Sequence, residues 1–317
     1  MAFSGAGVGT LVSPYEITTL TQLNEIRNDL SAYYILMNNI DATDTINWNS
    51  GAGWIPLGEN YSNEFRGYIN GDGHKITNLY INRSVEKSGF IGWLFGEVHN
   101  LGIENANVTV SGANFVGIMA GYVGGNAGVS GGILTKLVEN CWVSGTVNVD
   151  GNNVGGFYGY ASGGTTKDCY AIVDINYTGT DSNIGAFAGT NGTSTNCYSV
   201  SNLNFNGAGW AGTSGCYYDS DVAGTTVVRK ATPKTTIQMK TQATFTAYDF
   251  TDIWGIESSN NNGYPYLQIF GEEEPVVTDI SIQALIMNSS ADISNPFMLV
   301  TPNVTIQANE GFIRVVW

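Results

Sequence analysis

The middle of the chain alternates short apolar segments with glycines in five similar blocks. They read Gly89-Phe-Ile-Gly-Trp-Leu-Phe-Gly96, Val116-Gly-Ile-Met-Ala-Gly-Tyr122, Val154-Gly-Gly-Phe-Tyr-Gly-Tyr160, Ile184-Gly-Ala-Phe-Ala-Gly189 and Ala208-Gly-Trp-Ala-Gly212. Glycine lets a backbone turn a corner or approach a neighbouring strand closely. A pattern that recurs at a fixed period indicates a solenoid, in which each repeat buries its apolar face only by stacking on its neighbours.

A second block follows several of the first and carries equally spaced cysteines. It reads Val98-His-Asn-Leu-Gly-Ile103, Val138-Glu-Asn-Cys-Trp-Val143, Thr166-Lys-Asp-Cys-Tyr-Ala171 and Thr195-Asn-Cys-Tyr-Ser-Val200. Cys141, Cys169 and Cys197 lie 28 residues apart, which predicts a stack of buried thiols at one position on successive turns. A disulfide between adjacent turns is the alternative. No Cys-x-x-Cys motif supports a metal site, and Cys216 follows outside this spacing.

The segment before the repeats predicts a helix over Thr18 to Leu30. Its apolar residues share one face, and Thr19 or Thr21 can cap its first turn. Such a helix is well placed to cover the first open edge of a solenoid. From Tyr33 onward the pattern predicts strands of three to six residues, with a tight glycine turn at Asn70-Gly-Asp-Gly-His74. Residues 124–136 read as a glycine-rich loop.

The pattern changes after Cys216-Tyr-Tyr-Asp-Ser-Asp221. Residues 222–262 are threonine-rich, with a short helix expected near Thr236 to Lys240, and the charged run ending in Pro275 reads as a linker. We therefore expect a lead-in and capping helix (1–32), repeats (33–221), the end and cap of the solenoid (222–270), a linker (271–275) and a small β module (276–317). About 40 residues is small for an independent core, so this module should fold against a partner or its own copies.

These blocks resemble the GLUG-motif repeats of right-handed parallel β-helix proteins. The resemblance covers roughly residues 14–267, from Pro14-Tyr-Glu-Ile17 through Asn70-Gly-Asp-Gly-His-Lys-Ile76 to the Cys216-Tyr-Tyr-Asp block and the exit Gly263-Tyr-Pro-Tyr-Leu267. It implies an all-β fold, a right-handed parallel β-helix with an N-terminal capping helix and a small C-terminal β module. Family members are mostly surface proteins of bacteria and archaea, with some in their viruses, and the motif carries no catalytic residues.

Composition narrows the class of partner. Charged residues make up 12% of the chain, hydrophobic residues 43%, and the net charge is −15. A disordered chain would be less hydrophobic, and a nucleic-acid-binding chain would carry a basic stripe. No segment approaches the roughly 18 to 20 apolar residues that span a bilayer, and the first residues lack a basic n-region and an apolar h-region. Either a leader has been removed, or the protein leaves its cell in another way, such as in a virus particle.

The sequence favours neither a catalytic site nor a metal site. The acidic pairs Asp219 and Asp221, Asp168 and Asp174, and Glu97 and Glu104 are best explained as acids at solvated turns. The candidates for a basic catalytic residue are suggested only by their position; they are Lys136, Lys167, Arg66 and Arg83. The chain has two histidines, His74 and His99, which are too few for a histidine-based site. We therefore expect no catalytic residues, no metal and no cofactor; calcium at the Asn70 turn is a side alternative.

Aromatic residues beside the repeat glycines are the candidate binding residues, because rings at turns can stack on sugars or anchor interfaces. They are Trp93, Tyr122, Tyr158, Tyr160, Trp210, Tyr217 and Tyr218. We expect more than half of the aromatic rings near the repeat glycines to be at least partly buried. In the terminal module the candidate assembly residues are Ile282, Leu285, Phe297, Phe312, Val315 and Trp317.

Three functions compete at this point. The first is a non-enzymatic tail spike, fibre or capsid appendage on a virion surface, a homotrimer by analogy, that binds a host glycan and docks to its own copies or other virion proteins through residues 276–317. The second is an extracellular adhesin or filament subunit of a cell. The third, which predicts an acidic cleft with a base on one face, is a polysaccharide-cleaving enzyme.

Overall fold

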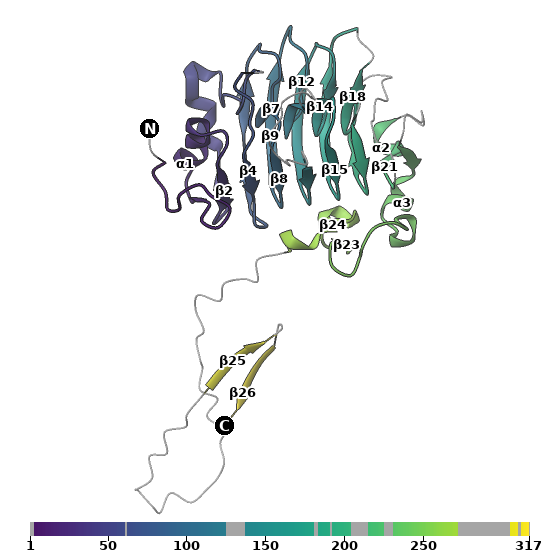
Figure 1. The fold of residues 1–317 in the computed structure, drawn as a ribbon. Coiled ribbons are helices and arrows are strands. Elements are labelled where there is room, and N and C mark those ends of the chain that lie inside the picture. Colours follow the sequence, from purple (N-terminus) through teal and green to yellow (C-terminus); the bar gives the residue numbers. More distant parts are fainter. Residues whose placement is uncertain are drawn as a thin grey trace, which may run out of the picture. The chain divides into compact units, whose positions relative to one another are not determined.

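The computed structural model describes residues 3–60, 62–124, 137–180, 183–190, 192–203, 215–224 and 231–271, together with the backbone of 305–309 and 312–316. Contacts within the chain divide it into two units, Met1–Glu273 and Glu274–Trp317. The fold of the first unit is mostly β, with parallel sheets (Figure 1). The expected loop at 124–136 lies outside the described residues from position 125 on.

Three larger parallel sheets make up the described part of the first unit. Sheet 1 has the order β1 (Tyr15–Ile17), β2 (Tyr33–Leu36), β4 (Tyr68–Asn70), β8 (Glu97–His99), β11 (Leu137–Glu139), β15 (Thr165–Lys167) and β19 (Thr193–Thr195). Sheet 2 has the order β18 (Ala188–Thr190), β14 (Tyr158–Ala161), β10 (Ala120–Val123) and β7 (Ile91–Leu94).

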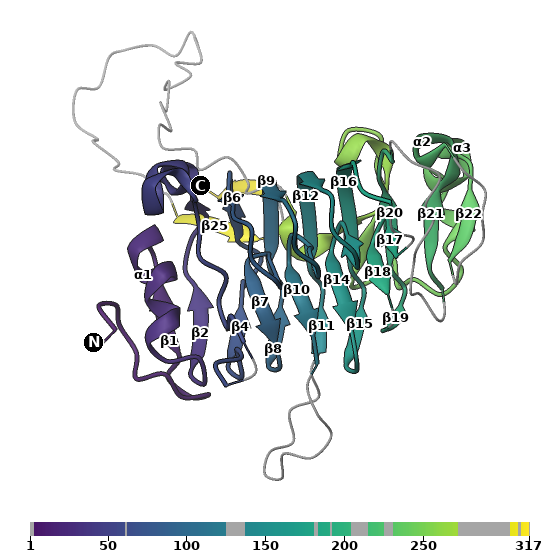
Figure 2. The same cartoon turned by 90° about the horizontal axis from the view of Figure 1, so that it is seen from above.

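Sheet 3 has the order β22 (Thr232–Lys234), β21 (Tyr217–Asp219), β20 (Tyr198–Val200), β16 (Tyr170–Tyr177), β12 (Trp142–Val149), β9 (Gly102–Val110), β5 (Lys75–Thr77) and β3 (Ile40–Asp41), with β6 (Tyr80–Asn82) also on β9. A short parallel pair joins β13 (Val154–Gly155) to β17 (Ile184–Gly185). Figure 2 shows the strands following one another in chain order along the unit.

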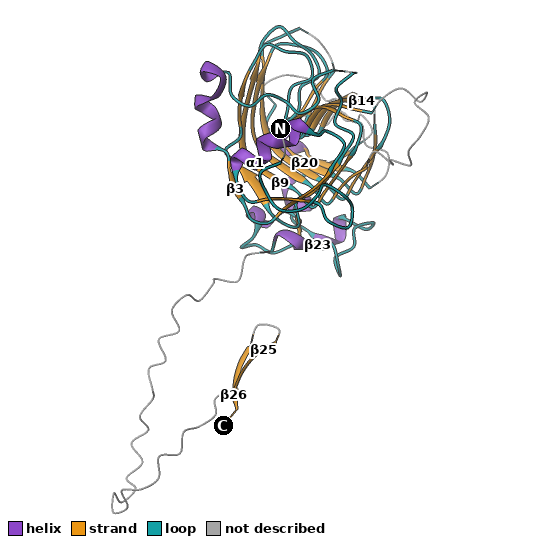
Figure 3. Ribbon diagram, turned by 60° about the vertical axis from the view of Figure 1, so that its left-hand side comes forward, coloured by secondary structure: helices purple, strands orange, loops and turns teal. Residues whose placement is uncertain are grey.

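The strand register follows the period of the sequence. Leu137 of β11 pairs with Thr165 of β15, and Trp142 of β12 pairs with Tyr170 of β16, both 28 residues further along. Successive repeats therefore place equivalent residues side by side. Apolar side chains from all three sheets form one continuous buried core, and Figure 3 shows the strands of each sheet lying behind one another.

The cysteines are buried in this core as free thiols. The amide of Cys141 lies 3.4 Å from the sulfur of Cys169, so cysteines 28 residues apart do lie side by side. The predicted thiol ladder is confirmed, and the disulfide alternative is wrong. Burial also raises the pKa of the Cys169 thiol, which keeps it protonated.

The N-terminal helix is shorter than expected. α1 spans Leu20–Glu25 and a 3-10 turn, η1, continues over Ile26–Asn28. Thr19 is the N-cap and forms a capping box with Gln22, which starts the helix later than Thr18. Asn28 and Asp29 favour turns over helix, which explains its early end. Leu23 and Ile26 are buried in the core. Figure 2 shows α1 at the N-terminal end of the row of strands.

The segment after the repeats packs on the outer face of sheet 3. It contains α3 (Thr236–Met239), which confirms the short helix expected there, and the antiparallel pair β23 (Trp254–Gly255) and β24 (Tyr266–Leu267). Its short elements also include α2 (Ser220–Ala223) and the 3-10 turns η3 (Gln242–Thr244), η4 (Asn261–Gly263) and η5 (Gln268–Phe270); η2 (Thr43–Gly51) lies near the start of the chain. A second apolar cluster, around Tyr198, Phe245 and Trp254, joins this segment to the sheet.

The second unit is described by one antiparallel hairpin, β25 (Thr305–Asn309) and β26 (Phe312–Val316). Phe312 and Val315 of the predicted assembly residues lie in β26, where they pair with Asn309 and Ile306. Ile282, Leu285, Phe297 and Trp317 lie outside the described residues, and the assembly role of all six stays a prediction.

Candidate functional site

Three of the predicted binding residues form one row on the outer face of sheet 2. Trp93 of β7, Tyr122 of β10 and Tyr160 of β14 occupy paired strand positions, and all three are half-buried. The ring centroids of Trp93 and Tyr122 lie 4.8 Å apart, and those of Tyr122 and Tyr160 lie 5.2 Å apart. We call Trp93, Tyr122 and Tyr160 the aromatic row.

A second line of residues flanks the aromatic row at a corner of the backbone. Lys87, Phe115 and Asn153 directly precede Ser88, Val116 and Val154, which are joined by parallel bridges. All three preceding residues have positive φ, between 57° and 64°. Phe115 stands edge-on to Tyr122 and Tyr160, with centroids 5.8 Å from each. The ammonium group of Lys87 lies 5.0 Å from the centroid of Trp93. A bulky residue such as Phe115 pays a conformational cost for this backbone, which the surrounding packing must offset.

The glycine blocks explain how this surface is built. Gly121 directly precedes Tyr122, and a Cβ atom on it would lie 2.5 Å from Lys87 Cα and 2.5 Å from the Phe115 carbonyl oxygen. Only a residue without a side chain lets these corners pack so closely against the strand. The recurring glycine therefore permits the close packing, and the residue directly after it contributes the ring of the aromatic row.

The remaining predicted binding residues do not join this row. Tyr158 is 1% exposed and belongs to the core, where its hydroxyl lies 3.3 Å from Ser194 Oγ. Tyr218 is also buried, and burial raises the pKa of both phenols. The choice of these two rings as binding residues was wrong, because both are buried and burial of a large ring is favourable. Tyr217 is half-buried against Phe245 in the second cluster, and Trp210 lies outside the described residues.

A row of charged side chains crosses the outer face of sheet 1. His99 Nε2 lies 3.2 Å from Glu97 Oε2, and its Nδ1 lies 3.8 Å from Glu139 Oε2. Lys167 Nζ lies 2.5 Å from Glu139 Oε1 and 3.2 Å from Asp168 Oδ2. Acids and bases thus share one face, as the enzyme hypothesis requires. They are paired with one another, however, which is an arrangement that stabilises neighbouring strands.

The acidic residues examined as pairs do not form catalytic pairs. Glu97 and Glu104 lie on different sheets, and Asp221 lies in α2 rather than on the strand that ends at Asp219. Asp168 and Asp219 are 1% and 0% exposed, so their placement at solvated turns was wrong. Turn position did not predict this burial because the partners lie far along the chain.

Each buried carboxylate is held by hydrogen bonds. Asp168 Oδ1 accepts from Trp254 Nε1 at 3.0 Å and from Asn196 Nδ2 at 3.2 Å. Asp219 caps α2 and accepts from Tyr264 Oη at 2.8 Å and Thr236 Oγ1 at 2.8 Å. These acids attach residues 236–271, which we call the covering segment, to the repeats.

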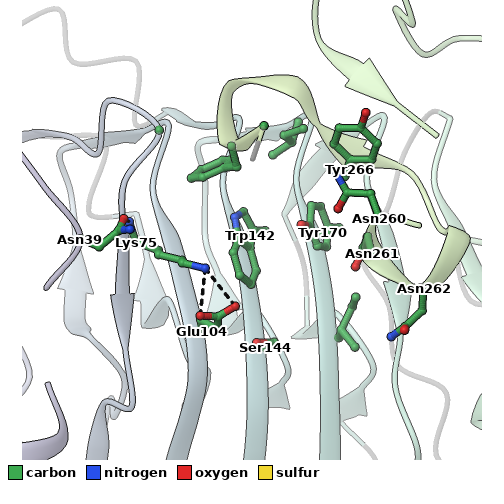
Figure 4. Close-up of a pocket in the computed structure, with 15 residues that line it drawn as sticks. Asn39, Lys75, Glu104, Trp142, Ser144, Tyr170, Asn260, Asn261, Asn262 and Tyr266 are labelled. Carbon is green, nitrogen blue, oxygen red and sulfur yellow. Dashed lines mark hydrogen bonds and ion pairs between the residues drawn. The ribbon is translucent and has the colours of Figure 1, made fainter. Parts of the chain in front are cut away.

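A cleft lies between the outer face of sheet 3 and the covering segment (Figure 4). It encloses about 660 Å³, within the range of small-molecule sites. Its lining residues are Asn39, Gly73, Lys75, Glu104, Trp142, Ser144, Tyr170, Ile172, Asn260, Asn261, Asn262, Tyr266, Leu267, Phe270 and Gly271. The lining mixes aromatic rings, side-chain amides and one Lys–Glu ion pair.

The aromatic floor of this cleft was missed, although the sequence carries a signal for it. Each of Cys141, Cys169, Cys197 and Cys216 is followed by an aromatic residue. Strand alternation that buries the cysteine points the next side chain outward. The rings accordingly stack in register on sheet 3, with Trp142 and Tyr170 centroids 5.6 Å apart and Tyr170 and Tyr198 centroids 5.1 Å apart.

Comparisons with known proteins give relatives for part of the chain. Halomucin of Haloquadratum walsbyi is 39% identical over 162 residues, 48% of this chain. A "Putative Gly-rich membrane protein" of Evansella cellulosilytica is 36% identical over 143 residues, 43% of this chain. The matches span only 2% and 16% of those two proteins' own lengths. No family model matches the chain.

A solved structure shares the fold. The crystal structure of a "putative immunoglobulin A1 protease" from Bacteroides ovatus superimposes with a TM-score of 0.63 at 20% identity, covering 83% of this chain and 94% of that one. At this identity the likeness extends to the fold alone. Within the described residues, no helix is both long and apolar enough to cross a membrane.

Proposed function

We propose that the chain is a non-enzymatic adhesion module, a right-handed parallel β-helix displayed at a cell surface, which binds glycan through the aromatic row. The observation that carries the proposal is the alignment of Trp93, Tyr122 and Tyr160 as half-exposed rings on one face. Aromatic rings offer rigid apolar surface with polar edges, which suits the apolar faces and hydroxyls of sugars.

The register and the relatives support the scaffold and its setting. Parallel pairing at a 28-residue offset is what stacked turns of a β-helix would produce. Both curated relatives have names that suit a surface or membrane location. On this ground we favour the cell surface over a virus particle. Attachment through residues 276–317 is part of the same proposal.

A non-enzymatic role is supported by the state of the acid–base groups. The carboxylates of Asp168 and Asp219 are buried and hydrogen-bonded, and His99, Glu139 and Lys167 are paired with one another. A glycosidase needs two carboxyl groups that face a shared sugar from opposite sides. These acids instead join strands and segments of the protein.

The proposal is tested by applying the full chain to an immobilised array of neutral and acidic glycans. Tyr122→Ala removes the central ring and should weaken binding about tenfold, or about 1.4 kcal/mol. Tyr33→Ala is the matched control, because Tyr33 is a half-buried tyrosine that stacks on Tyr68 at 5.7 Å on sheet 1. Equal affinities for Tyr122→Ala and the wild type would refute the row as the binding site.

A further inference from the structure

We propose that the cleft over sheet 3 is a second binding site, separate from the aromatic row, for one or two neutral pyranose units of a glycan. The cleft is lined by sheet 3 and the covering segment, whereas the aromatic row lies on sheet 2. The two sites can therefore be altered independently.

The floor of the cleft is built from in-register positions of four strands. Lys75, Gly102, Trp142 and Tyr170 pair with one another across β5, β9, β12 and β16. A Cβ atom on Gly102 would lie 2.7 Å from the indole nitrogen of Trp142, so the indole lies over this glycine. The ring sequence thus ends at Trp142, and the next outward side chain is the charged Lys75.

The covering segment forms one wall of the cleft and closes it at both ends. Further along sheet 3, the second cluster covers the same line of rings, and Tyr198 is 0% exposed there. At Trp142 the cover includes Phe270, which stands edge-on to the indole with centroids 5.9 Å apart. At the far end a Cβ atom on Gly73 would collide with the carbonyl oxygen of Ile269, so η5 touches the Gly73 turn. The space between these contacts is the cleft.

The polar groups of the cleft suit sugar hydroxyls. Lys75 Nζ lies 3.1 Å from Glu104 Oε2 and 3.3 Å from Oε1, and both side chains remain more than a third exposed (Figure 4). Carboxylate oxygens with free lone pairs accept hydrogen bonds from hydroxyls, and the ammonium group donates to them. Asn260 and Asn262 add side-chain amides to the opposite wall.

One buried donor at the floor lacks a partner. The indole N–H of Trp142 is enclosed and makes no hydrogen bond to any described residue, although the side chain is only 9% exposed. An unpaired buried donor costs about 1–3 kcal/mol. Because protein atoms enclose this N–H, we do not count it among the contacts to the ligand.

The charge of the site selects the ligand class. Glu104 lies on the floor and already pairs with Lys75, so the carboxylate or sulfate of an acidic sugar would find no second cation among the described residues that line the cleft. The net charge of −15 disfavours polyanions further. A neutral pyranose can place an apolar face on the half-buried ring of Tyr266 and its hydroxyls on Glu104, Lys75 and the amides.

The test is calorimetric titration of the full chain with cellotetraose, chitotetraose and tetragalacturonate. We expect at least one neutral tetrasaccharide to bind with a Kd of about 1 mM or tighter, and tetragalacturonate to bind more weakly. Glu104→Gln should weaken binding about tenfold, because a hydrogen bond to a charged acceptor is replaced by one to a neutral acceptor. Ser144→Phe should abolish binding by filling the cleft.

Glu139→Gln is the matched control, because Glu139 forms the same kind of Lys–Glu pair, with Lys167, on sheet 1. It should bind like the wild type. Thermal unfolding of each variant separates loss of binding from loss of fold. The proposal is overturned if neither neutral tetrasaccharide binds, if tetragalacturonate binds more tightly, if folded Ser144→Phe still binds, or if Glu104→Gln and Glu139→Gln bind equally.

Discussion

Replacing Gly121 by alanine probes the packing that builds the aromatic row. The added Cβ atom would lie 2.5 Å from Lys87 Cα and 2.5 Å from the Phe115 carbonyl oxygen, whereas ordinary contact begins at 3.4 Å. Backbone on two neighbouring segments would have to retreat by about 1 Å in a close-packed interior. Overpacking costs about 1–3 kcal/mol, and because backbone atoms cannot rotate away we expect about 3 kcal/mol here.

Gly163→Ala is the matched control for this change. Nothing lies within 4 Å of the position where its Cβ would stand, and its φ is not positive. Alanine there should leave stability unchanged or raise it by about 0.4–1 kcal/mol, by restricting the unfolded chain. Urea unfolding followed by circular dichroism measures both variants. A gap below about 0.5 kcal/mol between them would refute the argument that the glycine is required for close approach, since that is the size of an ordinary surface substitution.

Four further predictions concern the rest of the molecule. Asp219→Ala should lower stability by about 3 kcal/mol in urea unfolding, because it leaves the Tyr264 and Thr236 hydroxyls and the first turn of α2 without their acceptor; a loss under 1 kcal/mol would contradict this. Burial raises the pKa of Tyr170, Tyr198 and Tyr248, so stability should be constant up to about pH 10, where unfolded tyrosine ionises, and should fall as the pH rises further; unfolding free energies that stay level to pH 12 would be inconsistent with this. Cys141, Cys169, Cys197 and Cys216 should react with a thiol reagent only in denaturant, and rapid labelling of the folded chain would disprove their burial. A chain ending at residue 273 should unfold cooperatively and be monomeric by light scattering, while the full chain assembles. If both samples contain the same number of chains per particle, assembly through residues 276–317 is contradicted.

The periodic part of the fold could be predicted because each repeat has a similar order of apolar, glycine and cysteine residues. The 28-residue cysteine spacing predicted which residues stack, and the register of Trp142 on Tyr170 follows it. A glycine directly precedes Tyr122 and Tyr160, and this position beside a repeat glycine is why the two rings were chosen as candidate binding residues. A residue without a side chain permits the close approach of a neighbouring segment. Their exposure could not be separated from that of Tyr158, because burial depends on which neighbours enclose a ring.

The cleft could not be predicted, because it depends on a segment with no period. Residues 236–271 pack on sheet 3 through contacts that are far apart in sequence, such as Trp254 with Asp168 and Tyr264 with Asp219. Nothing in the local pattern of Asn260 or Phe270 indicates that they face Trp142. The same long-range contacts explain why Asp168 and Asp219 are buried although they sit at turns.

Glycan binding by the full chain, with variants of both surfaces measured side by side, tests the central claim most directly. The wild type, the triple variant Trp93→Ala, Tyr122→Ala and Tyr160→Ala, and Glu104→Gln would be applied to the same immobilised array at equal concentration, after thermal unfolding has shown that each is folded. The account predicts that the triple variant loses adhesion to the glycans of the aromatic row, identified as those that Tyr122→Ala binds more weakly, while Glu104→Gln retains adhesion to those glycans. Adhesion by the folded triple variant at the wild-type level would contradict the account.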